Sequence, residues 1–260
     1  MEYFAPLSLS QAEKIKKTLK GSYYLGGGSM LNWRGAPKAA GLIDLKALGL
    51  DNIKASKNKI EIGATVTVQE LALSKKVPRA LSKAAGTFTS LNVRNVATVG
   101  GSAAGGFFIS SILPVLSAYE TDVLYYLSGK KKSAPLNEWL RAKKGIVCAL
   151  IIKKLKRKVN VTEDKVASSD FPAIVTALGF DLRGGKIANA VIAVSGAKGQ
   201  LSISEKAAKY LAGLKPSEVN AVKLCGEALK DIDTFGNVKV SARVKQRMIE
   251  SHLRALLRAI

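Results

Sequence analysis

The stretch YLGGGSMLNW, residues 24–33, places three consecutive glycines, Gly26, Gly27 and Gly28, between an apolar segment and Ser29. Glycine alone accepts left-handed backbone dihedral angles at little cost, so one interpretation is a tight turn. The other is a ligand that lies directly on the main chain, because consecutive amide groups without side chains form a concave site for an anion. This stretch by itself leaves both interpretations open.

A second glycine-rich passage, TVGGS at residues 98–102, has a similar composition. We expect each passage to follow an extended segment, and each ends in a serine whose hydroxyl adds a hydrogen-bond donor. The sequence lacks the phosphate loop G-x-x-x-x-G-K-[ST], and the dinucleotide pattern G-x-G-x-x-G fails after Gly26 because residue 31 is Leu31. Two matched passages favour one diphosphate held between them over two unrelated turns.

The composition predicts a folded chain with an unusual charge. The 260 residues are 47% hydrophobic and 23% charged, which is typical of a globular protein of one or two domains. The 41 lysines and arginines and the 19 acidic residues give a net charge of +22, which would attract nucleic acid, an anionic membrane or an acidic protein. The cations can equally form a solvated surface, because they are spread along the chain. Only KKLKRK, residues 153–158, is dense, and we expect it to be a solvated linker after a strand.

The reactive side chains are few. The two cysteines, Cys148 and Cys225, lie far apart in the sequence and are too few for a thiolate cluster site, and no zinc site rich in histidine can be built. His252 is the single histidine, and its basic neighbours predict a position on the surface of a C-terminal helix rather than in a catalytic pair. Any redox chemistry must therefore be carried by a bound cofactor.

The N-terminal residues show no signal peptide. The longest apolar stretch, residues 107–119, contains Pro114 and is too short to cross a bilayer. Both features predict a cytoplasmic protein without a membrane span. Aromatic residues are not interleaved with the basic ones, which disfavours a nucleic-acid partner.

Hydrophobic periodicity predicts an α+β chain. A helix capped by a serine should run to about Leu19, and residues 59–71 alternate like a strand before a helix that begins near Gln69. Other predicted elements are strands at 22–25, 41–45 and 146–152, a helix at 80–85, a short helix and strand within 111–127, and a basic hairpin and a turn within 128–140.

A boundary near residue 158 separates a smaller C-terminal part. Residues 171–197 predict an antiparallel strand pair that turns at Gly184-Gly185. Two or three helices should follow. The last of them is amphipathic, and its apolar face is marked by Val244, Met248, Ile249, Leu253, Leu256, Leu257 and Ile260.

Longer motifs around the two glycine passages resemble a known family. LGGGSMLNW…LIDL…KIEIGATVTVQEL resembles the pattern AGGTDLL…LIDL…IGAxVTxxEL, and NVRNVATVGGSAAGG…ILPVLSAYETDV is similar to QIRNxATIGGNLAxADPAxDLPPALLALDAxV. These patterns are signatures of the FAD-binding, or medium, subunit of the molybdenum hydroxylases, the xanthine and carbon monoxide dehydrogenase family. The resemblance covers residues 1–158, and the C-terminal part is similar with less specific motifs.

The resemblance implies a fold and a cofactor site. The fold would be a two-subdomain FAD-binding domain over residues 1–158, divided at about residue 53, followed by an antiparallel sheet with helices over residues 159–260. The FAD diphosphate would lie on the backbone amides of Gly26, Gly27, Gly28 and Ser29, with Met30 and Leu31 continuing the cradle. The second wall would be formed by Thr98, Gly100, Gly101 and Ser102.

The resemblance also implies partners and an activity. The chain would be an oxidoreductase subunit of a xanthine, carbon monoxide or aldehyde dehydrogenase type of complex. Electrons would flow from a molybdenum cofactor on a large subunit, through two [2Fe–2S] clusters on a small subunit, to FAD on this chain and then to an external acceptor. The low cysteine count agrees, and the sequence offers this chain neither a catalytic residue nor a metal site.

Three side chains depart from the family pattern. Met30 stands where aspartate or histidine is usual, Ser102 replaces asparagine, and Ser111 replaces an aspartate that contacts the flavin region. Ser111 therefore remains a candidate cofactor contact without its carboxylate. FAD should be non-covalent, because neither cysteine adjoins a glycine passage and His252 is remote. The alternative is a non-enzymatic basic binding module, a degenerate family member that no longer holds flavin.

Overall fold

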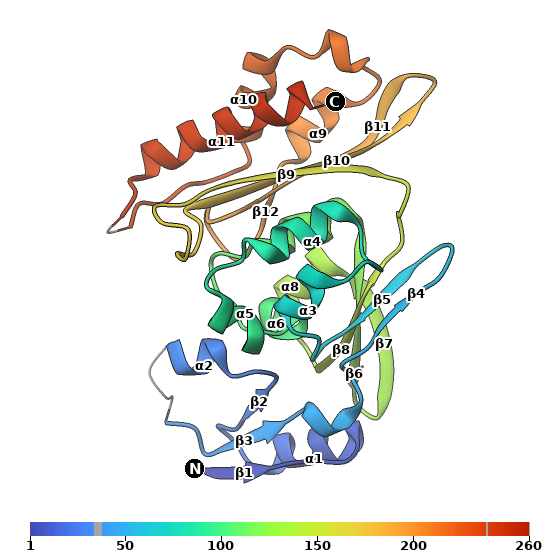
Figure 1. Cartoon of the computed structure of the whole chain (residues 1–260), viewed down its shortest axis with the longest axis vertical. Helices are drawn as coiled ribbons and strands as arrows, with labels where there is room; N and C mark the ends of the chain where they lie inside the picture. The colour runs from blue at the N-terminus through green and yellow to red at the C-terminus, as the bar shows by residue number, and fades with distance from the viewer. Residues whose placement is uncertain (34–37, 238, 260) are drawn as a thin grey trace. The chain divides into compact units, whose positions relative to one another are not determined.

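A computed structural model describes residues 1–33, 38–237 and 239–259 (Figure 1). The chain forms two compact units. The first unit comprises Met1–Val77, Leu91–Gly106 and Thr121–Lys153, and the second comprises Pro78–Ser90, Phe107–Glu120 and Lys154–Ile260. The last change of unit, after Lys153, lies near the boundary expected at residue 158. The two earlier segments of the second unit had no signal in the sequence, and the predicted domain bounds stay a prediction.

The first unit begins with a three-stranded parallel sheet in the order β1-β3-β2. Its strands are β1 (Glu2–Phe4), β2 (Tyr23–Leu25) and β3 (Gly41–Asp44), and helix α1 (Leu9–Thr18) lies between the first two in sequence. The predicted serine cap is confirmed, and the capping residue is Ser8, whose Oγ accepts a hydrogen bond from the Gln11 amide at 3.1 Å. Ala12 and Ile43 are fully buried in the small core of this sheet and helix.

A five-stranded antiparallel sheet follows, in the order β4-β5-β8-β6-β7. Its strands are β4 (Ile53–Ala55), β5 (Ile60–Gly63), β6 (Thr121–Leu127), β7 (Lys130–Pro135) and β8 (Ile146–Ile152). The apolar run IVCALII forms the central strand β8, where six of the seven residues are buried. The edge strand β7 carries three exposed lysines, Lys130, Lys131 and Lys132.

Short helices complete the first unit. They are α2 (Ser29–Trp33), α3 (Val68–Leu73), α5 (Leu91–Val96), α6 (Val99–Ala104) and α8 (Leu136–Ala142), and a 3-10 turn, η1 (Lys46–Leu48), follows β3. Two expectations were wrong. Residues 136–142 form a helix rather than a turn, because Leu136 and Trp139 bury one face. The second glycine passage follows helix α5 rather than an extended segment, and its glycines open helix α6.

The second unit is built on an antiparallel sheet in the order β12-β11-β10-β9. Its strands are β9 (Lys158–Asp164), β10 (Ile174–Arg183), β11 (Lys186–Ser195) and β12 (Ser202–Ile203). The predicted hairpin is confirmed: Arg183 pairs with Lys186, and Gly184 and Gly185 have φ of +57° and +74°. Both values lie in the region where only glycine is free of strain, which explains the glycine pair.

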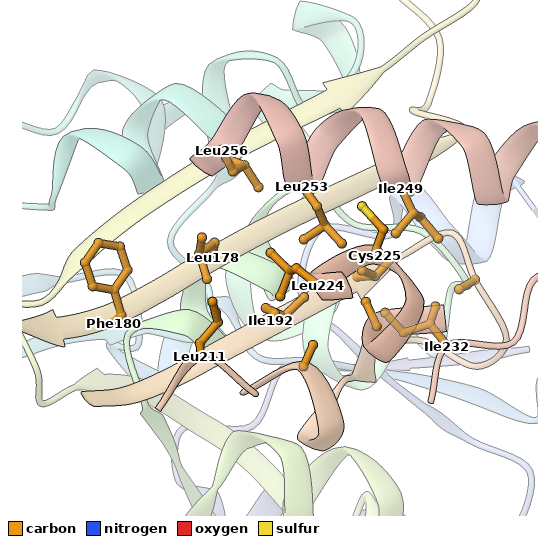
Figure 2. Close-up of a cluster of buried hydrophobic side chains, with 14 of the residues drawn as sticks. Leu178, Phe180, Ile192, Leu211, Leu224, Cys225, Ile232, Ile249, Leu253 and Leu256 are labelled. Carbon is orange, nitrogen blue, oxygen red and sulfur yellow. The ribbon is translucent and has the colours of Figure 1, made fainter. Parts of the chain in front are cut away.

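Helices cover both faces of this sheet. Helices α9 (Glu205–Leu211), α10 (Ala221–Leu229) and α11 (Ala242–Arg258) pack on one face, with a 3-10 turn, η2 (Pro216–Glu218), between α9 and α10. In Figure 2, Leu253 and Ile249 of α11 point toward the side chains of the sheet and of α10, and all belong to one buried cluster. Helices α4 (Arg79–Gly86) and α7 (Ile112–Ala118) pack against the same strands. A Cβ on Gly179 would lie 2.5 Å from the Ala118 carbonyl oxygen, so α7 approaches the opposite face closely.

His252 is buried, and the prediction of a surface histidine was wrong. Its side chain lies in the inward stripe of α11 with Ile249 and Leu253, whereas the basic residues that suggested exposure lie on the outer face. Nδ1 lies 3.1 Å from Thr176 Oγ1 of β10, and Nε2 lies 3.0 Å from Asp164 Oδ2 of β9. Val244, expected on the apolar face, is 43% exposed, and Ile260 lies outside the described residues.

The dense basic run at residues 153–158 is only partly a solvated linker. Lys158 already begins β9. The Arg157 side chain is fully buried, and its Nη1 donates to Glu120 Oε1 at 2.6 Å. A buried guanidinium requires such a partner, and a sequence pattern does not reveal a partner that lies 37 residues away. Among the described residues, no helix is long and apolar enough to cross a membrane.

Candidate functional site

The two glycine passages lie against each other in the first unit. A Cβ on Gly26 would lie 2.7 Å from Thr98 Oγ1, and a Cβ on Gly27 would lie 1.5 Å from the Val96 carbonyl oxygen. No side chain fits at either distance, so both positions require glycine. The main chain of the first passage is therefore approached closely, on this side, by Thr98 of the second passage and by Val96 at the end of α5.

Gly28 has a different reason to be glycine. Its φ is +75°, a left-handed conformation that side chains rarely adopt, and a Cβ would also lie 3.2 Å from Leu25 Cδ1. This residue turns the chain from the end of β2 into helix α2, which begins at Ser29. The tight turn considered from the sequence is thus present at Gly28, and a close approach of main chain is present at Gly26 and Gly27.

The amides of the first passage are available to a ligand. In the described part of the chain, the turn, loop and side-chain hydrogen bonds include none donated by the amides of Gly26, Gly27 or Gly28. Gly27 is exposed, and Gly26 and Gly28 are half-buried. Successive unbonded amides in a turn are the building block of an anion nest, so this loop remains the candidate for the diphosphate site.

The amides of the second passage are already used within the chain. Those of Val99, Gly100, Gly101 and Ser102 donate at 2.8–3.1 Å to Val66 O, Ala64 O, Thr98 Oγ1 and Thr98 O, respectively. These amides have acceptors within the chain, and a contact of this passage with a diphosphate stays a prediction. The glycines lie in the first turn of α6, where Thr98 caps the helix.

The second passage instead forms a rigid support for the first loop. Gly100 is buried, and a Cβ there would lie 2.7 Å from Ala64 Cβ, so α6 contacts the backbone that follows β5. Thr98 also forms an isolated antiparallel bridge with Thr67, the residue that caps α3. Arg94 Nε donates to Gln69 Oε1 at 2.9 Å, which ties α5 to α3. Together these contacts fix the Val96 carbonyl against Gly27.

The remaining predicted site residues are divided between the units. In the first unit, a Cβ on Gly105 would lie 3.6 Å from Met30 Cγ, Leu31 is half-buried, and Ser102 Oγ donates to Thr98 O at 3.0 Å. Ser111 lies in the second unit, is fully buried, and donates from Oγ to Glu163 Oε2 at 3.0 Å. All the predicted residues except Ser111 are thus brought together in the first unit.

The polar groups around the first loop suit binding rather than acid–base chemistry. Lys16 Nζ lies 5.6 and 5.8 Å from the ring centres of Tyr23 and Tyr24, which precede the loop. Burial raises the pKa of Tyr24 to about 12, so its phenol stays neutral. Among the described residues, no group of three or more histidine, cysteine, aspartate or glutamate side chains could hold a metal ion.

Sequence reasoning missed the residues that support the loop. Val96 contacts Gly27 through its carbonyl oxygen, and Ala64 contacts Gly100 through its carbonyl and its small side chain. Neither role requires a residue type that a sequence pattern would reveal. Gln69 and Arg94 form a polar pair 25 residues apart, which only the fold brings together. The Thr98 cap had a recognisable signal, because threonine is a preferred residue at the start of a helix, where its side-chain oxygen accepts from the amide three residues later.

Comparison with known proteins assigns this region to a family. A family model described as the FAD binding domain in molybdopterin dehydrogenase matches residues 1–155. Among curated proteins, the uncharacterized protein YgfM of Escherichia coli strain K12 is 34% identical over 128 residues, which cover 48% of this chain and 49% of YgfM. A YgfM of E. coli O157:H7 matches to the same extent. The chain spans about half the length of the curated relatives it matches.

Solved structures match nearly the whole chain. Carbon monoxide dehydrogenase from Hydrogenophaga pseudoflava, lacking the Mo-pyranopterin moiety of its cofactor, has a TM-score of 0.89 at 19% identity and covers 98% of this chain and 95% of its own. Quinoline 2-oxidoreductase from Pseudomonas putida 86 has a TM-score of 0.84 at 18% identity, with coverages of 99% and 95%. At these identities the likeness concerns the fold, and it confirms the predicted fold class.

Proposed function

The chain belongs to the family of FAD-binding domains of molybdopterin dehydrogenases, and we propose that it serves as the FAD-carrying electron-transfer subunit of a molybdenum hydroxylase complex. In this proposal, electrons from [2Fe–2S] clusters on a partner subunit reach an external acceptor by way of non-covalent FAD on this chain. When bound, FAD supplies the ring system that accepts and releases electrons. The protein's task is to bind and orient it.

The observation that carries this proposal is the row of amides at Gly26, Gly27 and Gly28, which donate none of the turn, loop or side-chain hydrogen bonds of the described residues. These amides would donate to the diphosphate oxygens of FAD, and such bonds to a charged acceptor are stronger than those between neutral groups. Ser29, Met30 and Leu31 would continue the contact along the start of α2. None of these roles depends on a particular carboxylate or histidine, so the departures at Met30 and Ser102 leave the phosphate contact intact.

The second passage would position the loop rather than bind the diphosphate. Its amides already donate to acceptors within the chain. Thr98 contacts Gly26, and the Val96 carbonyl contacts Gly27. We assign Thr98, Gly100 and Gly101 this positioning role. Ser111 donates to the Glu163 carboxylate within the second unit, and a contact of Ser111 with FAD stays a prediction.

The partners in this proposal are a large molybdenum-binding subunit and a small iron–sulfur subunit, in a cytoplasmic hetero-oligomer. The molybdenum cofactor and the clusters would reside on those subunits. In support, Cys148 and Cys225 are buried and unpaired, and burial raises the pKa of both thiols, which disfavours the thiolate form that ligates iron. The charge of +22 would favour docking on acidic partners, so co-purification should weaken as salt is raised.

Acid precipitation tests the mode of attachment. Because no cysteine or histidine is near the glycine loop in sequence, yellow colour should move to the supernatant when the purified protein is precipitated. Colour retained in the pellet would show a covalent bond and contradict the proposal.

The alternative is a basic binding module without flavin. The internally used amides of the second passage favour it, because they remove half of the anion site expected from the sequence. Visible absorbance of the purified chain, before and after incubation with FAD, separates the two functions. Flavin bands that survive gel filtration support the FAD subunit. A colourless, folded chain that does not take up FAD supports the alternative.

A further inference from the structure

The second unit carries an open groove whose residues have no role in the proposed FAD site. Its volume is about 660 Å³, a size that admits apolar side chains of a protein segment. The apolar lining consists of Phe108, Leu229, Ile232 and Phe235. Lys198, Asp233 and Gln246 supply polar groups to the same groove.

The two aromatic side chains of the groove, Phe108 and Phe235, contact each other and the buried Lys245. Phe108 and Phe235 meet edge to face, with ring centres 5.8 Å apart. Lys245 is fully buried, and its Nζ lies 4.2 Å from the centre of the Phe235 ring and donates to the Gly196 carbonyl at 2.8 Å. Phe235 is nevertheless 36% exposed. A large apolar ring that is fixed by a cation and still open to solvent has the properties of an anchor point in protein interfaces.

Helix α11, whose Gln246 lines the groove, carries four arginines on its outer face. Arg243, Arg247, Arg254 and Arg258 are all exposed. At about 100° per residue, these four positions fall within about 60° of one another around the helix axis, so they form one stripe. Gln246, which lines the groove, lies about 60° from Arg243 and about 100° from Arg247 around the helix axis, so Arg243 is the nearer of the two. Within the described residues, none of the four arginines forms an ion pair.

We propose that this groove docks an acidic segment of a partner protein, which inserts an apolar side chain against Phe235 while its carboxylates pair with Arg243 and Arg247. Arginine forms bidentate bonds to carboxylates, and an aromatic residue with arginines is a combination enriched in protein interfaces. A nucleic-acid strand would meet the same arginines, so tighter binding of an oligonucleotide is the outcome by which the test below separates this occupant from an acidic protein segment. The surface is independent of FAD binding and adds a function beyond it.

The test uses the full chain and defined probes. Fluorescein-labelled twelve-residue peptides of glutamate with a central leucine are compared with the same peptides carrying serine in place of leucine, and with a twelve-nucleotide oligouridylate. Fluorescence anisotropy at physiological ionic strength gives the dissociation constants. The leucine peptide should bind at least about tenfold more tightly than the serine peptide, as expected for one buried apolar side chain.

The variants locate the site. Phe235→Ala and the double variant Arg243→Glu, Arg247→Glu should each weaken binding of the leucine peptide at least about tenfold. The matched control is Arg254→Glu, Arg258→Glu, which makes the same charge change on the same stripe. Arg254 lies eight residues beyond Gln246, about 12 Å along the helix, which exceeds the screening length of about 8 Å at physiological salt. Because a twelve-residue peptide can reach that far, this control should weaken binding, but clearly less than the Arg243→Glu, Arg247→Glu variant does.

Several results would overturn the proposal. They are equal loss in both charge-reversed pairs, equal binding of the two peptides, tighter binding of the oligouridylate, or no binding of either peptide. The charge-reversed surface variants keep the test valid if Phe235→Ala unfolds, which circular dichroism reveals. FAD content is measured on every variant and should not change, so failure of this proposal and failure of the FAD proposal give different results.

Discussion

The carbonyl oxygen of Val96 lies 1.5 Å from the point where a Cβ on Gly27 would be. This single relationship joins the first glycine passage to the end of helix α5, two residues before the second passage, and explains why Gly27 cannot tolerate a side chain. Changing Gly27→Ala should destabilise the protein by about 3 kcal/mol or more, because a backbone segment must move to admit the methyl group. Thermal unfolding and FAD retention should both report the loss.

The matched control for this change is Gly226→Ala. Gly226 lies within α10, and a Cβ there would meet nothing within 4 Å. Alanine is a better helix former than glycine, so this variant should be unchanged or up to about 1 kcal/mol more stable. If Gly27→Ala and Gly226→Ala melt at the same temperature, the contact between Val96 and Gly27 does not exist as described.

Thr98 should act on FAD affinity through position. Replacing it with valine removes the acceptor for the Gly101 amide and should cost about 1–2 kcal/mol of stability and weaken FAD binding. Thr98→Ser keeps the oxygen and should preserve FAD affinity. Isothermal titration with FAD and thermal melts compare the two variants, and equal FAD affinities would remove Thr98 from the positioning role.

His252 should make the second unit sensitive to acid. Burial lowers the pKa of its imidazole below the ordinary value near 6.5, although the carboxylates of Asp164 and Glu163 oppose this shift. The unfolded chain therefore binds the proton first, and stability should fall as the pH drops below about 6.5. The urea unfolding midpoint, measured from pH 8 to 5.5, should decline less in His252→Gln. Parallel declines would assign the effect to other groups.

Two carboxylates that lie close to a change of unit in the sequence, Glu120 and Asp122, should differ in their contribution to stability. Glu120 pairs with the fully buried Arg157, whereas Asp122 pairs at 2.8 Å with Lys153, which is 49% exposed. Glu120→Gln leaves a buried cation uncompensated and should cost about 2–4 kcal/mol, while Asp122→Asn should cost less than about 1 kcal/mol. Chemical denaturation measures both. A larger loss for Asp122→Asn would contradict the assigned burial.

Local signals in the sequence predicted many elements of this fold. The serine cap of α1, the apolar run of β8 and the turn at Gly184-Gly185 each depend on residues close together in the chain, and each is confirmed. The helix at Leu136–Ala142 was missed because it is short and its stability comes from burying Leu136 and Trp139, which only tertiary packing provides.

The candidate site was less predictable for the same physical reason. Three consecutive glycines mark a special backbone, but the sequence does not say that the carbonyl of Val96 lies on one side of it. The sequence also does not reveal whether an amide is already bonded within the chain. The Gly100 amide, for example, donates to the carbonyl of Ala64, which lies 36 residues earlier. His252 shows the same limit, because its partners lie on β9 and β10, the nearer of them 76 residues away.

The three lysines on strand β7 have a consequence for behaviour at high concentration. An unpaired strand at the border of a sheet is a template on which another molecule can add a strand and start an aggregate. Lys130, Lys131 and Lys132 are exposed on this border, so two molecules that met there would bring rows of ammonium groups face to face. Such repulsion disfavours growth of the sheet into a fibril, so part of the large positive charge serves as a barrier to pairing at this edge.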